Sequence, residues 1–221
     1  MEACDSCICR VQGLHAFFIA GFLLKEGCEF FTFRVNRLHR EISARLGVSV
    51  LFPLARERHP GWTLASFTAW PPINYGLVEE GIGVHKHCAS DSELTDAACE
   101  YIGAAEDVRL LYIALDAPDA LGHQSGYDTP PQHQAIAVAE ERLLRIVAID
   151  CRGWLEDSLI LFVTDHGGGG ENAYNHGSDH PMDWTIFWAA IGPYVNPNAN
   201  LEGLTFKDTA AVVAAALGYR P

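Results

Sequence analysis

The sequence predicts an α/β fold in which a mostly parallel sheet is covered by helices on both faces. Continuous apolar runs of strand length occur at 108–115 and 158–164. Segments with apolar residues at helical spacing lie between such runs. Alternation at these lengths is typical of parallel βαβ units. Hydrophobic residues make up 49% of the 221 residues, which is sufficient for one globular domain with a sizeable core.

Four strands and four helices are expected from residue 48 onward. The predicted helices span 48–58, 90–103, 131–154 and 206–217, and the predicted strands span 62–70, 108–115, 158–164 and 184–191. Breakers support these boundaries: His59-Pro60-Gly61 ends the first helix, and Pro71-Pro72 ends the first strand. Ser90 or Asp91 is the expected N-cap of the second helix.

The charge balance argues against a nucleic-acid-binding protein. The formal net charge is −13 and the isoelectric point is about 5.1. Four Arg residues between 34 and 45 are interpreted as a solvated helix face. An acidic chain repels phosphorylated substrates unless bound metal ions offset the charge. A bound metal ion would therefore favour the binding of a small phosphate ester or nucleotide by this chain.

The N-terminal region gives no clear compartment. Cys4, Cys7 and Cys9 form C-x2-C-x-C, which is interpreted as free thiols, with a metal knuckle as the alternative. The apolar run at 13–24 is twelve residues long, too short to span a bilayer. A buried helix or strand is the favoured interpretation, and the core of a signal peptide is the alternative.

Asp and His residues cluster after two of the predicted strands. Asp119 and His123 follow the strand at 108–115, in what is predicted to be a Gly-containing loop. Asp165 and His166 follow the strand at 158–164, and His176 comes ten residues later. Open α/β sheets place their sites beyond the carboxyl ends of such strands. Carboxylates and imidazoles are ligands that suit Zn²⁺ and similar divalent ions, so a metal site is expected.

These motifs carry a resemblance to a known family. D-x-x-G-H at 119–123, T-D-H-G-G at 164–168 and H-G at 176–177 resemble the type I phosphodiesterase/nucleotide pyrophosphatase group of the alkaline phosphatase superfamily. The similarity covers about residues 48–218, including WTLASFTAWPPI at 62–73. It implies a three-layer α/β/α sandwich. It also implies hydrolysis of phosphodiester or nucleotide pyrophosphate bonds with divalent ions, Zn²⁺ first and Mn²⁺ as the alternative.

The resemblance assigns the ligands to two ions. Asp119, His123 and His176 would hold one ion, and Asp165 and His166 would contribute to the second. In the family, the second ion also takes an Asp from the first strand and the oxygen of a Thr or Ser nucleophile. The resemblance therefore implies two further residues near the N-terminus.

Those two residues have no clear match in this chain. Residues 7–31 contain no Ser or Thr, and Asp5 is the only Asp before Asp91. Thr32 lies in an aromatic run without a nucleophile signature. We therefore expect an N-terminally truncated member, with 1–47 as an atypical, replaced or misread segment and 48–221 as the metal-binding domain. Two functions remain open: an active hydrolase and a non-catalytic metal-binding remnant. The chain has no C/S-x-P-x-R pattern, which disfavours a sulfatase.

Other polar residues are weaker candidates. His180 is an alternative to His176, and Asp116 is an alternative to Asp119. The remaining candidates form two pairs. A structural role is expected for each pair, and a contact with substrate is the alternative. His85 and His87 are expected to lie in a solvated loop. Asn74 and Tyr75 are expected to form a capped turn.

Overall fold

The computed structural model describes most of the chain beyond residue 47. The described residues are 19–25, 48–105, 107–148, 158–192, 195–196 and 198–219. Thr32 and the three cysteines of the C-x2-C-x-C group lie outside these ranges, as does most of the segment 1–47. Cys88 and Cys99 are free thiols. No described helix combines the length and apolar character needed to cross a bilayer.

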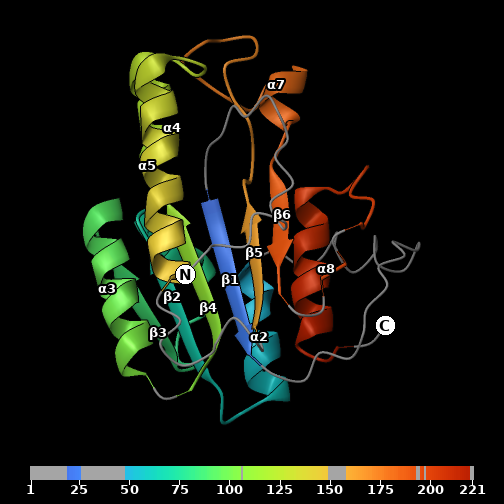
Figure 1. The fold of residues 1–221 in the computed structure, drawn as a ribbon. Helices are drawn as coiled ribbons and strands as arrows, with labels where there is room; N and C mark the ends of the chain where they lie inside the picture. The colour runs from blue at the N-terminus through green and yellow to red at the C-terminus, as the bar shows by residue number, and fades with distance from the viewer. Residues whose placement is uncertain are drawn as a thin grey trace.

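One six-stranded sheet forms the centre of the structure (Figure 1), with the strand order β3-β2-β4-β1-β5-β6. The strands are β1 (Ile19–Lys25), β2 (Thr63–Thr68), β3 (Val84–Cys88), β4 (Val108–Leu115), β5 (Ser158–Val163) and β6 (Trp188–Ile191). β2 pairs in parallel with both β3 and β4. β1 is antiparallel to β4 and β5, and β6 is antiparallel to β5. The sheet is therefore mixed, with a parallel unit of three strands, and the prediction of a mostly parallel sheet is wrong because β1 lies antiparallel between β4 and β5.

Helices pack on both faces of this sheet (Figure 1). They are α2 (Val48–Arg58), α3 (Asp91–Ala104), α4 (Ala117–Ser125), α5 (Pro130–Val147), α7 (Pro181–Trp184) and α8 (Phe206–Ala216), with a π-helix, η1 (Ile73–Leu77). α2 and α8 share one apolar core, and α3 and α5 share the other. Alternate residues of β4 enter the two cores, because successive side chains of a strand point to opposite faces.

Several predicted elements are confirmed. The helix at 48–58 and the strand at 108–115 match the structure to the residue. Ser90 is the N-cap of α3 and forms a capping box with Glu93. The apolar run at 13–24 contains most of strand β1. The helix predicted at 131–154 corresponds to α5, which ends at Val147.

Three predictions of local structure are wrong. The expected loop around Asp119 is helix α4, because Pro118 is well tolerated in the first turn of a helix. The strand predicted at 184–191 begins only at Trp188, because Pro181 starts the short helix α7. The loop expected at His85 and His87 is the edge strand β3.

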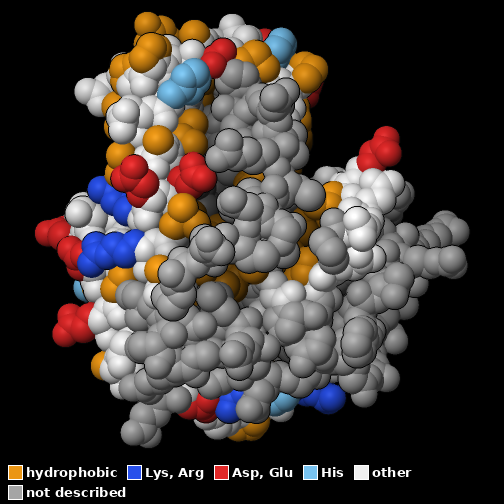
Figure 2. Space-filling view, in the orientation of Figure 1, with side chains coloured by type: hydrophobic (Ala, Val, Ile, Leu, Met, Phe, Trp, Pro, Cys, Tyr) orange, Lys and Arg blue, Asp and Glu red, His pale blue; other side chains and the backbone are white. Residues whose placement is uncertain are grey.

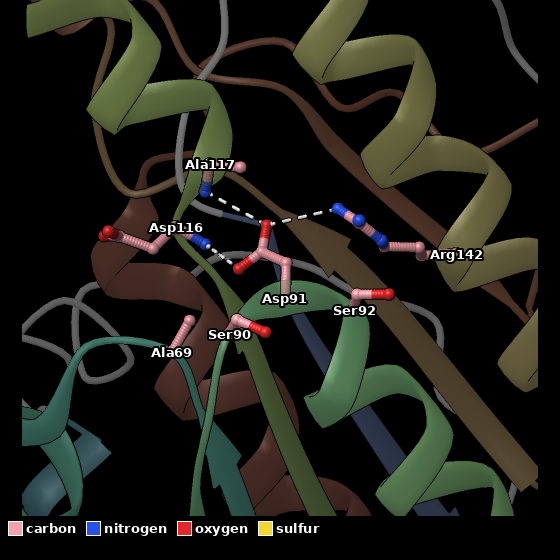
Figure 3. A pocket seen from close by; sticks show the side chains of 7 residues that line it. All are labelled: Ala69, Ser90, Asp91, Ser92, Asp116, Ala117 and Arg142. Atoms are coloured by element: carbon pink, nitrogen blue, oxygen red, sulfur yellow. Dashed lines mark hydrogen bonds and ion pairs between the residues drawn. The ribbon is translucent and has the colours of Figure 1, made fainter.

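Asp91 joins three helices beneath the carboxyl edge of the parallel strands (Figure 3). Its carboxylate, at the start of α3, accepts hydrogen bonds from the backbone N–H groups of Asp116 (2.9 Å) and Ala117 (3.0 Å), where α4 begins. Arg142 of α5 lies 3.7 Å from the same carboxylate. A carboxylate at this position satisfies backbone donors that helix α4 leaves unpaired and complements the helix dipole. Asp91 therefore fixes where α4 begins.

Replacement of Asp91 by Ala is expected to lower the free energy of unfolding by about 2 kcal/mol, because two half-buried N–H groups at the start of α4 lose their acceptor. Urea unfolding of the metal-free protein measures the effect. Asp96→Ala is the matched control. The carboxylate of Asp96 on α3 lies 2.7 Å from the guanidinium group of Arg145 on α5, and both side chains are exposed. Figure 2 shows acidic and basic side chains side by side over α3 and α5.

The control is expected to cost less than about 1 kcal/mol, as exposed ion pairs usually do. Equal losses for Asp91→Ala and Asp96→Ala would show that Asp91 does not anchor α4.

Candidate metal centre

The candidate ligands come from segments that begin at one edge of the sheet. Asp119 lies in the first turn of α4, which begins two residues after β4 ends. His166 follows the end of β5 by three residues, and His176 lies further along the same connection. β4 and β5 are both antiparallel to β1, so they run in the same direction and their carboxyl ends meet at this edge. The topology thereby brings the expected motifs together.

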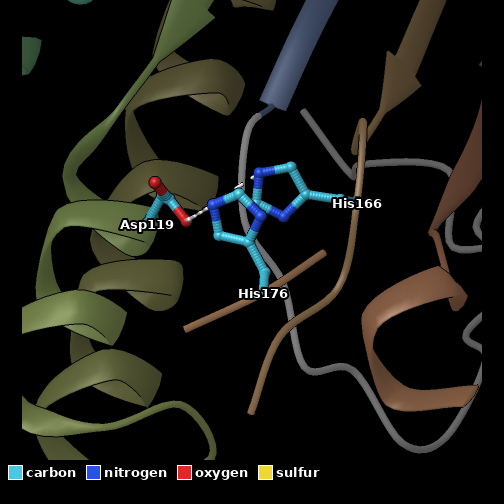
Figure 4. A group of neighbouring side chains, drawn as sticks. All are labelled: Asp119, His166 and His176. Carbon is cyan, nitrogen blue, oxygen red and sulfur yellow. Dashed lines mark ion pairs between the residues drawn. The ribbon is translucent and has the colours of Figure 1, made fainter. Parts of the chain in front are cut away.

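Asp119, His166 and His176 form a cluster that could hold a metal ion (Figure 4). One ligand atom from each residue lies within 4.8 Å of the others. Asp119 Oδ1 is 3.9 Å from His166 Nε2 and 4.0 Å from His176 Nε2. The two imidazole rings are stacked, with centroids 3.7 Å apart. Ligands of a tetrahedral Zn²⁺ ion lie about 3.4 Å apart, so the two distances from Asp119 exceed that spacing by roughly half an ångström.

Backbone carbonyls fix the tautomers of two imidazoles. His166 Nδ1 lies 2.7 Å from the carbonyl oxygen of Gly167, and His123 Nδ1 lies 2.9 Å from that of Tyr174. A carbonyl oxygen only accepts hydrogen bonds, so Nδ1 is assigned as the protonated donor in each ring. In this tautomer Nε2 is the unprotonated nitrogen, and in both rings it faces Asp119. This orientation is typical of histidines that bind metal ions.

His123 and Asp165 lie beside the cluster. His123 is one helical turn after Asp119, and its Nε2 is 3.5 Å from Asp119 Oδ2. Asp165 Oδ1 is 3.8 Å from His166 Nε2. The cluster therefore combines residues from both predicted ion sites, and the division of the five ligands between two ions stays a prediction.

Burial and neighbouring charges shift several pKa values at this edge. Burial raises the pKa of Asp165 to about 6, with Asp119 adding to the increase and His166 opposing it. Burial also raises the pKa of Asp116, and the charge of Asp119 contributes. Burial lowers the pKa of His176, as does the adjacent His166. A lowered pKa favours the neutral imidazole, which is the form that binds metal.

The glycines at 167–170 let neighbouring atoms approach the backbone closely, and they also give the backbone conformational freedom. A Cβ atom at Gly167 would overlap the carbonyl group of Met182, and one at Gly170 would lie 2.5 Å from His180 Cβ. Gly169 has φ of +81°, a conformation that glycine adopts readily. The run therefore needs glycine for packing against α7, in addition to the backbone freedom that its sequence suggests.

Asp183 holds the ends of the loop that carries His176. Its buried carboxylate accepts hydrogen bonds from Gly170 N (2.9 Å), Ser178 N (2.8 Å) and Ser178 Oγ (2.6 Å). Burial opposes ionisation of Asp183, but the hydrogen bonds from Ser178 and Gly170 outweigh it and lower the pKa. Sequence reasoning missed Asp183, because its partners are five and thirteen residues away and share no motif with it.

Tyr127 is the second residue that sequence reasoning missed. Its hydroxyl group donates a hydrogen bond to Asp119 Oδ1 at 2.5 Å. Burial and this hydrogen bond raise the pKa of Tyr127 well above its usual value, so the phenol remains a donor. The two residues are eight positions apart, and no helical or strand periodicity links them.

The weaker polar candidates have structural contacts outside the cluster. His180 caps α7, since its Nδ1 accepts a hydrogen bond from Met182 N. Asp116 is the N-cap residue of α4, and its backbone N–H is bonded to Asp91. Of the described residues, the three that meet as a possible ion site include neither His180 nor Asp116.

The remaining candidates lie around β3. His85 stacks on Tyr101 with ring centroids 4.6 Å apart, and His87 lies 5.6 Å from the ring of Phe67. Asn74 is fully buried and bridges β2 and β3, because its side-chain amide donates hydrogen bonds to the backbone carbonyl oxygens of Ser66 and His87. Tyr75 is 63% exposed. These contacts give Asn74 a structural role, but Asn74 and Tyr75 lie in the π-helix η1 and not in the capped turn that was expected.

Comparison with known proteins found no relative of this chain. No family model, curated protein or solved structure matches the chain. The resemblance to the phosphodiesterase group therefore depends on the motif residues of the sequence alone.

Proposed function

We propose that the chain is a metal-dependent hydrolase of phosphodiester or nucleotide pyrophosphate bonds, with Zn²⁺ as the preferred ion and Mn²⁺ as the alternative. The observation that carries the proposal is the convergence of Asp119, His166 and His176 at the carboxyl edge of β4 and β5. A three-layer sandwich of the alkaline phosphatase type is part of the same proposal. The pairing of α2 with α8 and of α3 with α5 on opposite faces supports it.

The chain's own groups suit the binding of an ion and of an anionic ester. Asp119, His166 and His176 would hold the ion, which supplies Lewis-acid polarisation of a phosphoryl oxygen when bound. His123 is 43% exposed and keeps its Nε2 beside Asp119, where it is accessible to a small substrate. Asp165 is next to His166 and would contribute to a second ion, as the resemblance implies.

A non-catalytic metal-binding protein is the second candidate function, and the hydroxyl groups near the cluster favour it. The Tyr127 hydroxyl is bonded to Asp119. Thr164, which directly precedes Asp165, is buried, and its Oγ1 accepts a hydrogen bond from Phe187 N at 2.8 Å. Both side chains are buried, so neither hydroxyl group is presented to a phosphate ester as a nucleophile.

Removal of a cluster ligand is expected to abolish tight binding of one divalent ion. Asp119→Ala and His176→Ala each remove one of three ligand atoms, and a Zn²⁺ site with two protein ligands binds weakly. Isothermal titration with Zn²⁺ and metal analysis after gel filtration measure affinity and stoichiometry. Unchanged stoichiometry in both variants would refute the assignment.

His180→Ala is the matched control for this experiment. His180 lies four residues from His176, and its imidazole caps α7. The variant is expected to retain the affinity of the unmodified protein for Zn²⁺. A loss of Zn²⁺ binding in His180→Ala together with normal binding in His176→Ala would show that His180, and not His176, is the metal ligand.

Hydrolysis of a chromogenic phosphodiester separates the two candidate functions. The proposed hydrolase is expected to turn over bis(p-nitrophenyl) phosphate when Zn²⁺ or Mn²⁺ is added, and His176→Ala is expected to lose this activity. Release of p-nitrophenol is followed by absorbance, and circular dichroism confirms that both proteins are folded. Stoichiometric Zn²⁺ binding without turnover would instead favour the non-catalytic function.

A further inference from the structure

Tyr127 is buried between two of the segments that carry candidate ligands. Its side chain lies against Gly122 of α4 and against Gly168 and Gly169 of the loop after β5. A Cβ atom at Gly122 or Gly168 would come within 2.5 Å of its ring, and one at Gly169 would lie 2.8 Å from its Cβ. The residue is only 4% exposed. The ring therefore occupies space that these glycines leave open, and it packs α4 against the loop.

Tyr127 also contacts the third ligand-bearing segment. Its backbone N–H donates to the carbonyl oxygen of Ala173 at 2.7 Å, three residues before His176. The Tyr127 ring approaches the His176 ring edge-on, with centroids 6.3 Å apart and an interplanar angle of 82°. One residue thus touches all three segments of the cluster.

The hydroxyl group of Tyr127 selects one oxygen of the Asp119 carboxylate. It is bonded to Oδ1, the oxygen that also lies closest to the Nε2 atoms of His166 and His176. The other oxygen, Oδ2, is directed toward His123. At 2.5 Å this bond is at the short end of the range for hydrogen bonds to a carboxylate.

We propose that Tyr127 is a positioning residue that holds Asp119 Oδ1 toward His166 and His176, ready to bind a metal ion. The inference rests on the proposed metal site and deepens it. The terminal torsion of an Asp side chain is broad, so the carboxylate would rotate toward His123 without this hydrogen bond. Partners that orient metal ligands commonly change metal affinity by about 10- to 100-fold.

Tyr127→Phe tests the proposal, because it keeps the ring that fills the glycine-lined space and removes only the hydroxyl. Competition with a chromophoric chelator measures the Kd for Zn²⁺, and the visible absorption spectrum reports the coordination of Co²⁺ in its place. Tyr127→Phe is expected to weaken Zn²⁺ binding about 10-fold or more and to change the Co²⁺ spectrum. Tyr174→Phe is the matched control, since Tyr174 is 57% exposed on the same loop, and it is expected to change neither.

The outcomes separate this proposal from the proposed function. Tyr127→Phe binding within twofold of the unmodified protein, with the same Co²⁺ spectrum, overturns the role of Tyr127 alone. An equal loss in Tyr174→Phe also overturns it. An unmodified protein that binds neither ion overturns the metal site and this proposal together. If Tyr127→Phe does not fold, 3-fluorotyrosine at position 127 makes the donor more acidic; an unchanged Co²⁺ spectrum then overturns the proposal.

Discussion

The candidate metal centre depends on a carboxylate that lies outside it. Asp91 accepts the hydrogen bonds of the two N–H groups with which α4 begins, and Arg142 holds that carboxylate from α5. Asp119 is within one turn of this helix start, so a shift of the start would move the Asp119 oxygen by a similar distance. Metal ligation tolerates only small displacements, and the two backbone hydrogen bonds therefore constrain the site as strictly as its own residues do.

A second anchor holds the opposite side of the cluster. Asp183 fastens the loop that carries His176 at both ends, and Gly167 packs against the backbone of α7 so closely that a side chain would not fit. α4 is thus attached to α3 and α5, and the loop is attached to α7. Tyr127 lies where these two assemblies meet, and it contacts both. The positions of the candidate ligands therefore depend on the anchoring of α4 by Asp91, the anchoring of the loop by Asp183, and the buried side chain of Tyr127 between them.

The sequence predicted the parts of the fold that local chemistry determines. The helix at 48–58 ends at a Pro-Gly breaker, and the strand at 108–115 is apolar along nearly its whole length because both faces are buried. Asp119, His166 and His176 could be predicted because they follow strands. Helix α4 could not, because Pro118 and Gly122 resemble loop residues until the first-turn position and the packing of Tyr127 are known. The edge strand β3 is short and polar, so no apolar pattern marks it.

Charge explains why one site suits both candidate functions. The chain carries a net charge of −13, and Asp165 and Asp119 lie close together at the cluster. A bound divalent ion would offset this local charge, and any ligand that binds only the folded state stabilises it. If they bind an ion, the same three residues would stabilise the folded state whether or not catalysis occurs. Catalysis additionally needs a nucleophile, and the hydroxyls of Tyr127 and Thr164 are already engaged. A hydrolase built on this cluster would therefore need another nucleophilic side chain or a water molecule, and only a side chain would form a covalent phosphoryl–protein intermediate.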